Sequence, residues 1–117
     1  MTPEELRSRT KKFALRVVKV YRSLPRTPDA QVMGRQLLRC GTSVAANYRA
    51  SCRARSKAEF ASRVGIVVEE ADESGFWLEM LVEADIVKAP LLEDLLRESK
   101  ELTAIFTATV RSVKKRN

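Results

Sequence analysis

The chain has 117 residues, of which 44% are hydrophobic and 32% charged, and it carries a formal net charge of +7 with no histidine. This length and balance predict one folded domain and exclude a disordered chain. No apolar run approaches the ~20 residues of a membrane span, and the N-terminus lacks the apolar core of a signal peptide. We therefore expect a soluble, cytoplasmic protein with no membrane partner.

The first predicted helix covers residues 3–24. Thr2 is its expected N-cap, and Glu5 stands three residues further on, where it can complete a capping box. Apolar side chains recur every three or four positions along the segment, which is the spacing of a face that packs on a core. Pro25 follows and ends the helix.

The second predicted helix covers residues 28–54 and is the most basic part of the chain. Four of its arginines fall within roughly 80° of one another around an ideal helix, opposite its apolar seam. Together with two basic residues that follow, they form a basic stripe with no acid between Asp29 and Glu59. The stripe consists of Arg35, Arg39, Arg49, Arg53, Arg55 and Lys57.

The remaining predicted helices cover residues 57–86 and 90–115. Ser56 and Glu59 have the spacing of a second capping box, and the last helix has acids in its first turn and bases in its last, as the helix dipole favours. No alternating, strand-like segment is present in the sequence. The pattern predicts an all-α protein that folds as an antiparallel up-down-up-down four-helix bundle.

A second apolar surface is predicted on the third helix, about 80–180° from the centre of its core-facing seam. Large apolar side chains left outside a core suit a contact between subunits, so we expect a homo-oligomer. In the alternative interpretation Trp77 packs on a neighbouring helix and only Phe76 stays partly exposed. The predicted interface residues are Ile66, Phe76, Trp77 and Met80.

No constellation of catalytic residues is found, so we expect a protein that is not an enzyme, with no metal site and no cofactor. Cys40 and Cys52 lie on one predicted helix about 18 Å apart, too far for a disulfide. The acidic residues 69–73 lack the histidines of a di-metal bundle site and are better explained as a solvated or inter-subunit ion-pair face. Asn47 is expected to make a structural hydrogen bond between helices.

Two functional hypotheses follow from the basic stripe. In the first it contacts the phosphates of a nucleic acid, together with cations of the first helix. In the second the protein is an adaptor, whose stripe binds an acidic partner or builds a ring by meeting residues 69–73 of a neighbouring subunit. A solvated helix face with no partner is the simplest alternative. The first-helix candidates are Lys11, Lys12, Arg16 and Lys19.

Residues 36–81 carry a family resemblance. They read QLLRCGTSVAANYRASCRARSKAEFASRVGIVVEEADESGFWLEML, and this segment resembles the four-helix-bundle family of 23S rRNA intervening-sequence proteins. Many members continue the SVAAN motif with IAEG, whereas this chain continues with YRAS, which is similar to a more basic branch. The elements that carry the resemblance are Gln36, Arg39, residues 43–47, residues 55–56, Phe60, residues 69–74 and residues 77–79.

The resemblance implies a left-handed bundle without enzymatic activity, a ring-shaped homopentamer and an association with nucleic acid. A related branch of the family serves as the accessory subunit of diversity-generating retroelement reverse transcriptases. The resemblance therefore also implies that a protein partner is conceivable.

Overall fold

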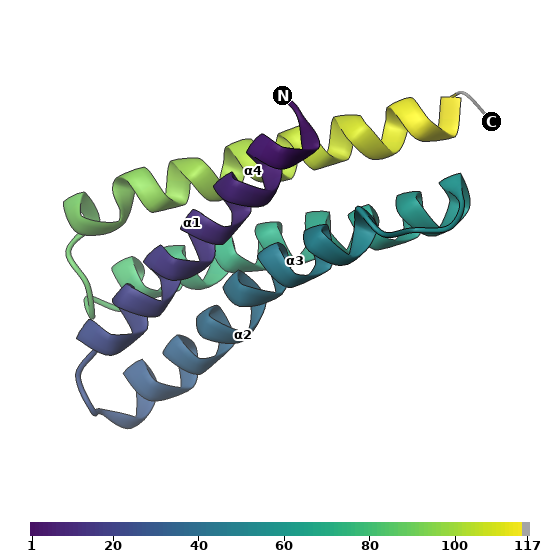
Figure 1. The fold of residues 1–117 in the computed structure, drawn as a ribbon. Coiled ribbons are helices and arrows are strands. Elements are labelled where there is room, and N and C mark those ends of the chain that lie inside the picture. The colour runs from purple at the N-terminus through teal and green to yellow at the C-terminus, as the bar shows by residue number, and fades with distance from the viewer. Residues whose placement is uncertain (116–117) are drawn as a thin grey trace.

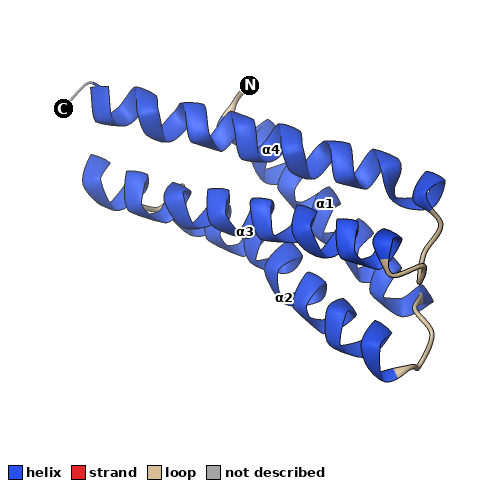
Figure 2. Cartoon of the chain, turned by 180° about the vertical axis from the view of Figure 1, so that it is seen from behind, coloured by secondary structure: helices blue, strands red, loops and turns tan. Residues whose placement is uncertain are grey.

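The computed structural model describes residues 1–115 and consists of four α-helices joined by short loops (Figure 1). Consecutive helices run in opposite directions, and no strand occurs in residues 1–115 (Figure 2). This confirms the predicted all-α four-helix bundle. The helices are α1 (Pro3–Ser23), α2 (Pro28–Ser51), α3 (Lys57–Glu83) and α4 (Ala89–Lys115).

The core is a continuous apolar cluster to which all four helices contribute. Phe13 of α1 and Phe106 of α4 are its largest fully buried side chains. α2 and α3 add aliphatic side chains such as Leu37 and Leu78, which are also fully buried. The apolar seams predicted from periodicity therefore face one another, as expected for amphipathic helices in a bundle. None of the helices in this described part combines the length and the apolar composition needed to cross a membrane.

The helix starts follow the predicted caps, with one difference in α3. Thr2 and Glu5 form the complete capping box at the start of α1. At the start of α3, Ser56 Oγ accepts a hydrogen bond from the Glu59 N–H at 3.0 Å, as a cap should. The Glu59 carboxylate, however, accepts from the N–H of Arg55 at 2.9 Å, one residue before the N-cap. Glu59 thus fixes the loop that precedes α3.

Two helices end three residues earlier than predicted, and α1 ends one residue earlier, at Ser23. α2 ends at Ser51 instead of residue 54, and the chain then turns through Cys52. α3 ends at Glu83 instead of residue 86, because Asp85 takes a left-handed backbone conformation with φ of 60°. The amide of Ile86 then bonds back to the carbonyl of Leu81 at 3.0 Å, which closes the helix end.

The close contact between α1 and α2 depends on Gly41. A Cβ atom at this position would lie 2.8 Å from both γ-methyl carbons of Val17. Val17 is itself fully buried and branched at Cβ, so it cannot easily move aside. The missing side chain at Gly41 therefore allows the backbones of the two helices to approach.

The pair formed by α1 and α4 is looser. Their ribbons approach near the start of α1 and diverge toward its end (Figure 1, Figure 2). Arg9 donates from Nε and Nη2 to the two carboxylate oxygens of Glu98, each at 2.7 Å. Residues two positions apart point to nearly opposite sides of a helix. Since Arg9 faces α4, Arg7 and Lys11 are directed to the other side of α1, toward α2.

We predict opposite stability effects for the same substitution at two glycines. Gly41→Ala should lower the free energy of unfolding by about 1 kcal/mol, because overpacking against Val17 outweighs the gain in helix propensity. Gly65→Ala, where no atom lies within 4 Å of the added Cβ, should raise it by about 0.5–1 kcal/mol. Urea denaturation followed by circular dichroism checks both. Equal effects at the two sites would contradict the close contact at Gly41.

Candidate functional site

The six residues of the basic stripe lie in different environments in the structure. All six side chains are exposed, as the helical pattern predicts. Arg39 alone among them forms an ion pair within residues 1–115. Arg39 and Arg49 lie at opposite edges of the stripe, about 80° apart around the helix. Arg39 accordingly faces α3, and Arg49 faces α1.

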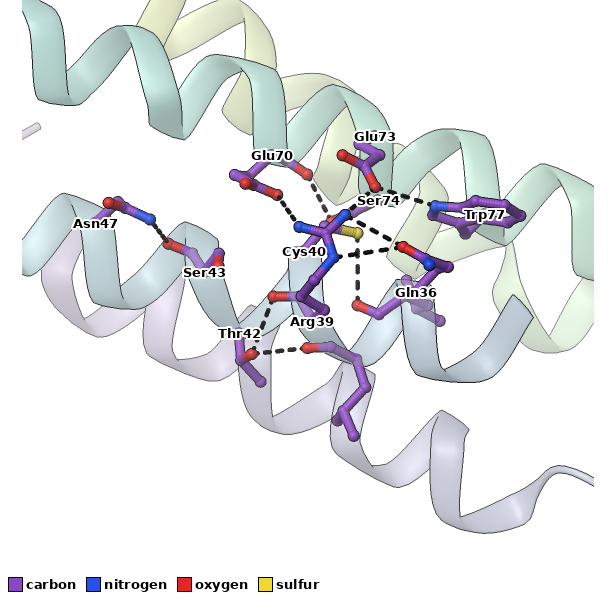
Figure 3. A network of polar contacts seen from close by, with 12 residues as sticks. Gln36, Arg39, Cys40, Thr42, Ser43, Asn47, Glu70, Glu73, Ser74 and Trp77 are labelled. Atoms are coloured by element: carbon purple, nitrogen blue, oxygen red, sulfur yellow. Dashed lines mark hydrogen bonds and ion pairs between the residues drawn. The ribbon is translucent and has the colours of Figure 1, made fainter. Parts of the chain in front are cut away.

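Arg39 is neutralised by its own chain. Its Nη1 lies 3.4 Å from Oε2 of Glu70, and its Nη2 donates to Glu73 (Figure 3). Trp77 Nε1 donates to the same Glu73 carboxylate at 3.3 Å, and Gln36 accepts from the guanidinium. This arrangement differs from the expected solvated or inter-subunit face at residues 69–73, because two of those carboxylates tie α3 to α2 within one protomer. Burial raises the pKa of Glu70, and the charge of Arg39 opposes that shift.

Two further polar side chains of α2 and α3 have hydrogen-bond partners within the chain. Ser74 Oγ donates to the buried sulfur of Cys40 at 3.3 Å, and burial raises the pKa of the Cys40 thiol (Figure 3). Asn47 Nδ2 donates to the carbonyl of Ser43 on its own helix at 3.0 Å. The expectation of an interhelical bond from Asn47 is therefore wrong: the short amide side chain satisfies a carbonyl one turn earlier instead.

A basic groove runs between α1 and α2, along the edge of the basic stripe that Arg49 occupies. Its volume is about 940 Å³. Long cationic side chains stand along it, while small side chains such as Ala45 and Ala46 leave it open. The residues that line it are Glu4, Arg7, Ser8, Lys11, Thr42, Ala45, Ala46, Arg49, Cys52 and Arg53.

Electrostatics make this groove the strongest candidate for a binding site. It contains four cations, Arg7, Lys11, Arg49 and Arg53, against the single carboxylate of Glu4. None of the four forms an ion pair with another described residue. Like charges gathered in a concave surface raise the local concentration of anions. The groove can therefore hold a chain of anionic groups.

A second pocket, the end pocket, continues from the groove at the end of the bundle. Its volume is about 500 Å³, and it shares Arg7 and Cys52 with the groove. Apolar side chains from all four helices line it together with three cations. Its lining residues are Pro3, Arg7, Tyr48, Ser51, Cys52, Ala54, Arg55, Ser56, Lys57, Phe60 and Val113.

The six predicted stripe residues thus fall into four places. Arg49 and Arg53 line the basic groove, and Arg55 and Lys57 line the end pocket. Arg39 is paired with α3, and Arg35 lies on the exposed surface outside both cavities.

Sequence reasoning missed one cation of the groove. Of the four first-helix candidates only Lys11 lines it, and Arg7 was not among those candidates. Arg7 precedes Lys11 by four residues and so shares its face, which is the signal that could have identified it.

The predicted subunit contact is partly exposed. Phe76 has 51% and Ile66 39% of its surface accessible. Trp77 is half-buried against the core, and its ring meets the ring of Phe76 edge-on with centroids 4.8 Å apart. Met80 is also half-buried. Trp77 thus packs inward as in the alternative interpretation, but Ile66 is accessible as well as Phe76.

Fold and groove together define a four-helix-bundle protein with a basic cleft between its first two helices. The chain belongs to the family of 23S rRNA-intervening sequence proteins, whose family model matches residues 5–108. No curated protein matches it.

Among solved structures, the chain is similar to a protein of unknown function from the S23 ribosomal protein family of Bacteroides thetaiotaomicron VPI-5482. The two sequences are 30% identical, and the superposition has a TM-score of 0.87 over 95% of this chain and 99% of the other.

The two cysteines provide a direct check of the groove. We predict that iodoacetamide alkylates Cys52 in the native protein and Cys40 only after unfolding, because Cys52 is exposed and Cys40 is buried. Mass spectrometry of peptides from native and urea-unfolded samples measures both rates. Comparable rates at the two thiols in the native protein would contradict the described position of Cys52 at the groove.

Proposed function

We propose that this protein is a non-enzymatic oligomeric bundle that binds the phosphate backbone of nucleic acid in the basic groove. The observation that carries the proposal is the set of four cations from α1, α2 and the turn after α2 that no carboxylate of the described residues pairs with. Phosphate contacts supply most of the affinity of non-specific nucleic-acid binding, and guanidinium groups suit them geometrically. Because the groove presents no recognised base-reading motif, the contacts are directed to the backbone.

The family supports this proposal in a general way, since its description refers to intervening sequences of 23S rRNA. In a cyclic oligomer the groove would be repeated by symmetry, so moderate affinity at each protomer would become strong overall binding. We propose that this assembly is a homopentamer, as the family resemblance implies, with Phe76 and Ile66 at the subunit contact. The chain offers no histidine for acid–base chemistry, which fits a binding role.

The adaptor hypothesis gains less support. Arg39 would have met an acidic partner or a neighbouring subunit, but Glu70 and Glu73 of the same chain already occupy it. The groove could still receive an acidic protein segment. The charge-reversal experiment that follows separates that alternative from nucleic-acid binding.

Reversing two groove charges should weaken nucleic-acid binding. For the double variant Arg49→Glu/Arg53→Glu we expect an affinity loss of about tenfold or more for a fluorescent RNA hairpin with a single-stranded overhang. The wild-type slope of log affinity against log salt should be about −3 to −4 per protomer if all four cations contact phosphates. The double variant should lose about two units of that slope. Fluorescence anisotropy over a salt series measures both quantities.

Arg35→Glu is the matched control, because Arg35 is an exposed arginine of the same helix outside the groove. It should change the affinity by less than about threefold and leave the slope unchanged. RNA binding that survives the double variant, or that hardly responds to salt, would refute the groove as the nucleic-acid site. Failure of the wild-type protein to bind the RNA would refute the proposed function and favour an acidic protein partner.

The subunit contact can be tested separately. Phe76→Ser should reduce the molar mass measured by light scattering from that of an oligomer to that of one protomer, because it removes the largest exposed aromatic surface of α3. Leu91→Ser, at a side chain on α4 with 75% of its surface accessible, is the matched control and should leave the mass unchanged. An unchanged mass for Phe76→Ser would exclude this contact. Loss of the oligomer in the groove double variant would instead assign the cations to ring assembly.

A further inference from the structure

The end pocket combines an apolar interior with a cationic margin. Tyr48, Phe60 and Val113 bring side chains from α2, α3 and α4 to it. Arg55 and Lys57 lie in and just after the loop between α2 and α3 and add positive charge. A volume of about 500 Å³ lies within the range typical of small-ligand sites, which are mostly apolar with a few polar groups.

The walls of this pocket are fixed by contacts within the chain. The ring of Tyr48 packs against Phe106 with centroids 5.0 Å apart. The loop that carries Arg55 is held by the bond from its amide to Glu59, and Arg63 in turn lies 3.3 Å from the Glu59 carboxylate. A pocket that is already formed does not require ordering when a ligand enters.

The Tyr48 hydroxyl adds a polar group. Burial, followed by the proximity of Cys52, raises the pKa of Tyr48 to about 12. The phenol therefore stays protonated at neutral pH and can donate a hydrogen bond.

The end pocket adjoins the basic groove, because Arg7 and Cys52 line both. A strand whose phosphates follow the cations of the groove would reach the pocket at its end. Cationic grooves with adjacent aromatic side chains are the pattern by which proteins hold single strands, since every base has a face that can stack. A base within a continuous duplex could enter only after it had been unpaired and unstacked, and that step is unfavourable.

We propose that the end pocket receives one unpaired nucleobase of a strand that lies in the basic groove, so that the ligand is single-stranded nucleic acid or an unpaired strand end. This inference rests on the proposed function and names the ligand class of the same site. The half-buried ring of Phe60 supplies the aromatic surface for the base, and Tyr48, which is only 3% exposed, contributes its hydroxyl. Arg7, at the junction of the two cavities, lies where the phosphate of that nucleotide would pass.

The test compares two probes of equal charge: a short fluorescent oligodeoxyadenylate and an abasic oligomer with the same number of phosphates. Wild-type protein should bind the base-bearing strand at least about fivefold more tightly than the abasic strand, which is the effect of one stacked base. Ala54→Leu, which places extra carbon atoms in the end pocket, should abolish this preference and leave the affinity for the abasic strand unchanged. Phe60→Leu, which keeps an apolar side chain without an aromatic face, should reduce the preference in the same way.

Ala46→Leu is the matched control, because the same substitution then lies in the groove and outside the end pocket. This variant should lower the affinity for both probes by the same factor, so that the ratio of the two affinities is preserved. Equal affinity of wild-type protein for the two probes, or a preference that persists in Ala54→Leu, would overturn the inference and leave backbone binding intact. Failure of the wild type to bind either probe would overturn the proposed function and this inference together.

Discussion

The contact between Val17 of α1 and Gly41 of α2 is the constraint on which the proposed site depends. A side chain at residue 41 would separate the two helices, since its Cβ would lie 2.8 Å from the γ-methyl carbons of a buried valine. With glycine there, the helices approach closely, and cations from both line a common groove. The Arg9–Glu98 ion pair holds one side of α1 against α4. The opposite side of α1, with Arg7 and Lys11, is thereby directed toward α2.

The distribution of carboxylates then decides which cations can bind a ligand. Glu70 and Glu73 of α3 neutralise Arg39, whereas α1 brings only one carboxylate, that of Glu4, to the groove. Gathering like charges opposes folding through mutual repulsion, and such clusters are tolerated where function requires them. The groove thus keeps four cations without an ion-pair partner, while two carboxylates of α3 help to hold α3 against α2.

The cleft and the end pocket make different chemical contributions to one surface. The groove offers positive charge over small side chains and suits a backbone of phosphates, while the end pocket offers aromatic surface and a protonated phenol. A ligand that occupied both the groove and the end pocket would be an anionic chain with at least one planar group that is not stacked on its neighbours. The exposed Phe76 and Ile66 belong to α3, whereas the groove is formed by α1 and α2, so assembly and binding need not compete for the same residues.

The amino-acid sequence by itself determined the four helices and their buried faces, because caps and apolar periodicity are local signals. Thr2 and Ser56 start their helices where predicted, whereas the left-handed conformation of Asp85 that ends α3 early leaves no comparable signal. The exposure of the α2 arginines was also predictable, since it follows from helical geometry. Their partners were not: only the packing of three separate helices placed Arg39 against Glu73 and Arg49 in one groove with Arg7. Periodicity fixes the direction of a side chain around its own helix, but the neighbouring helix and the distance to it are decided by tertiary packing.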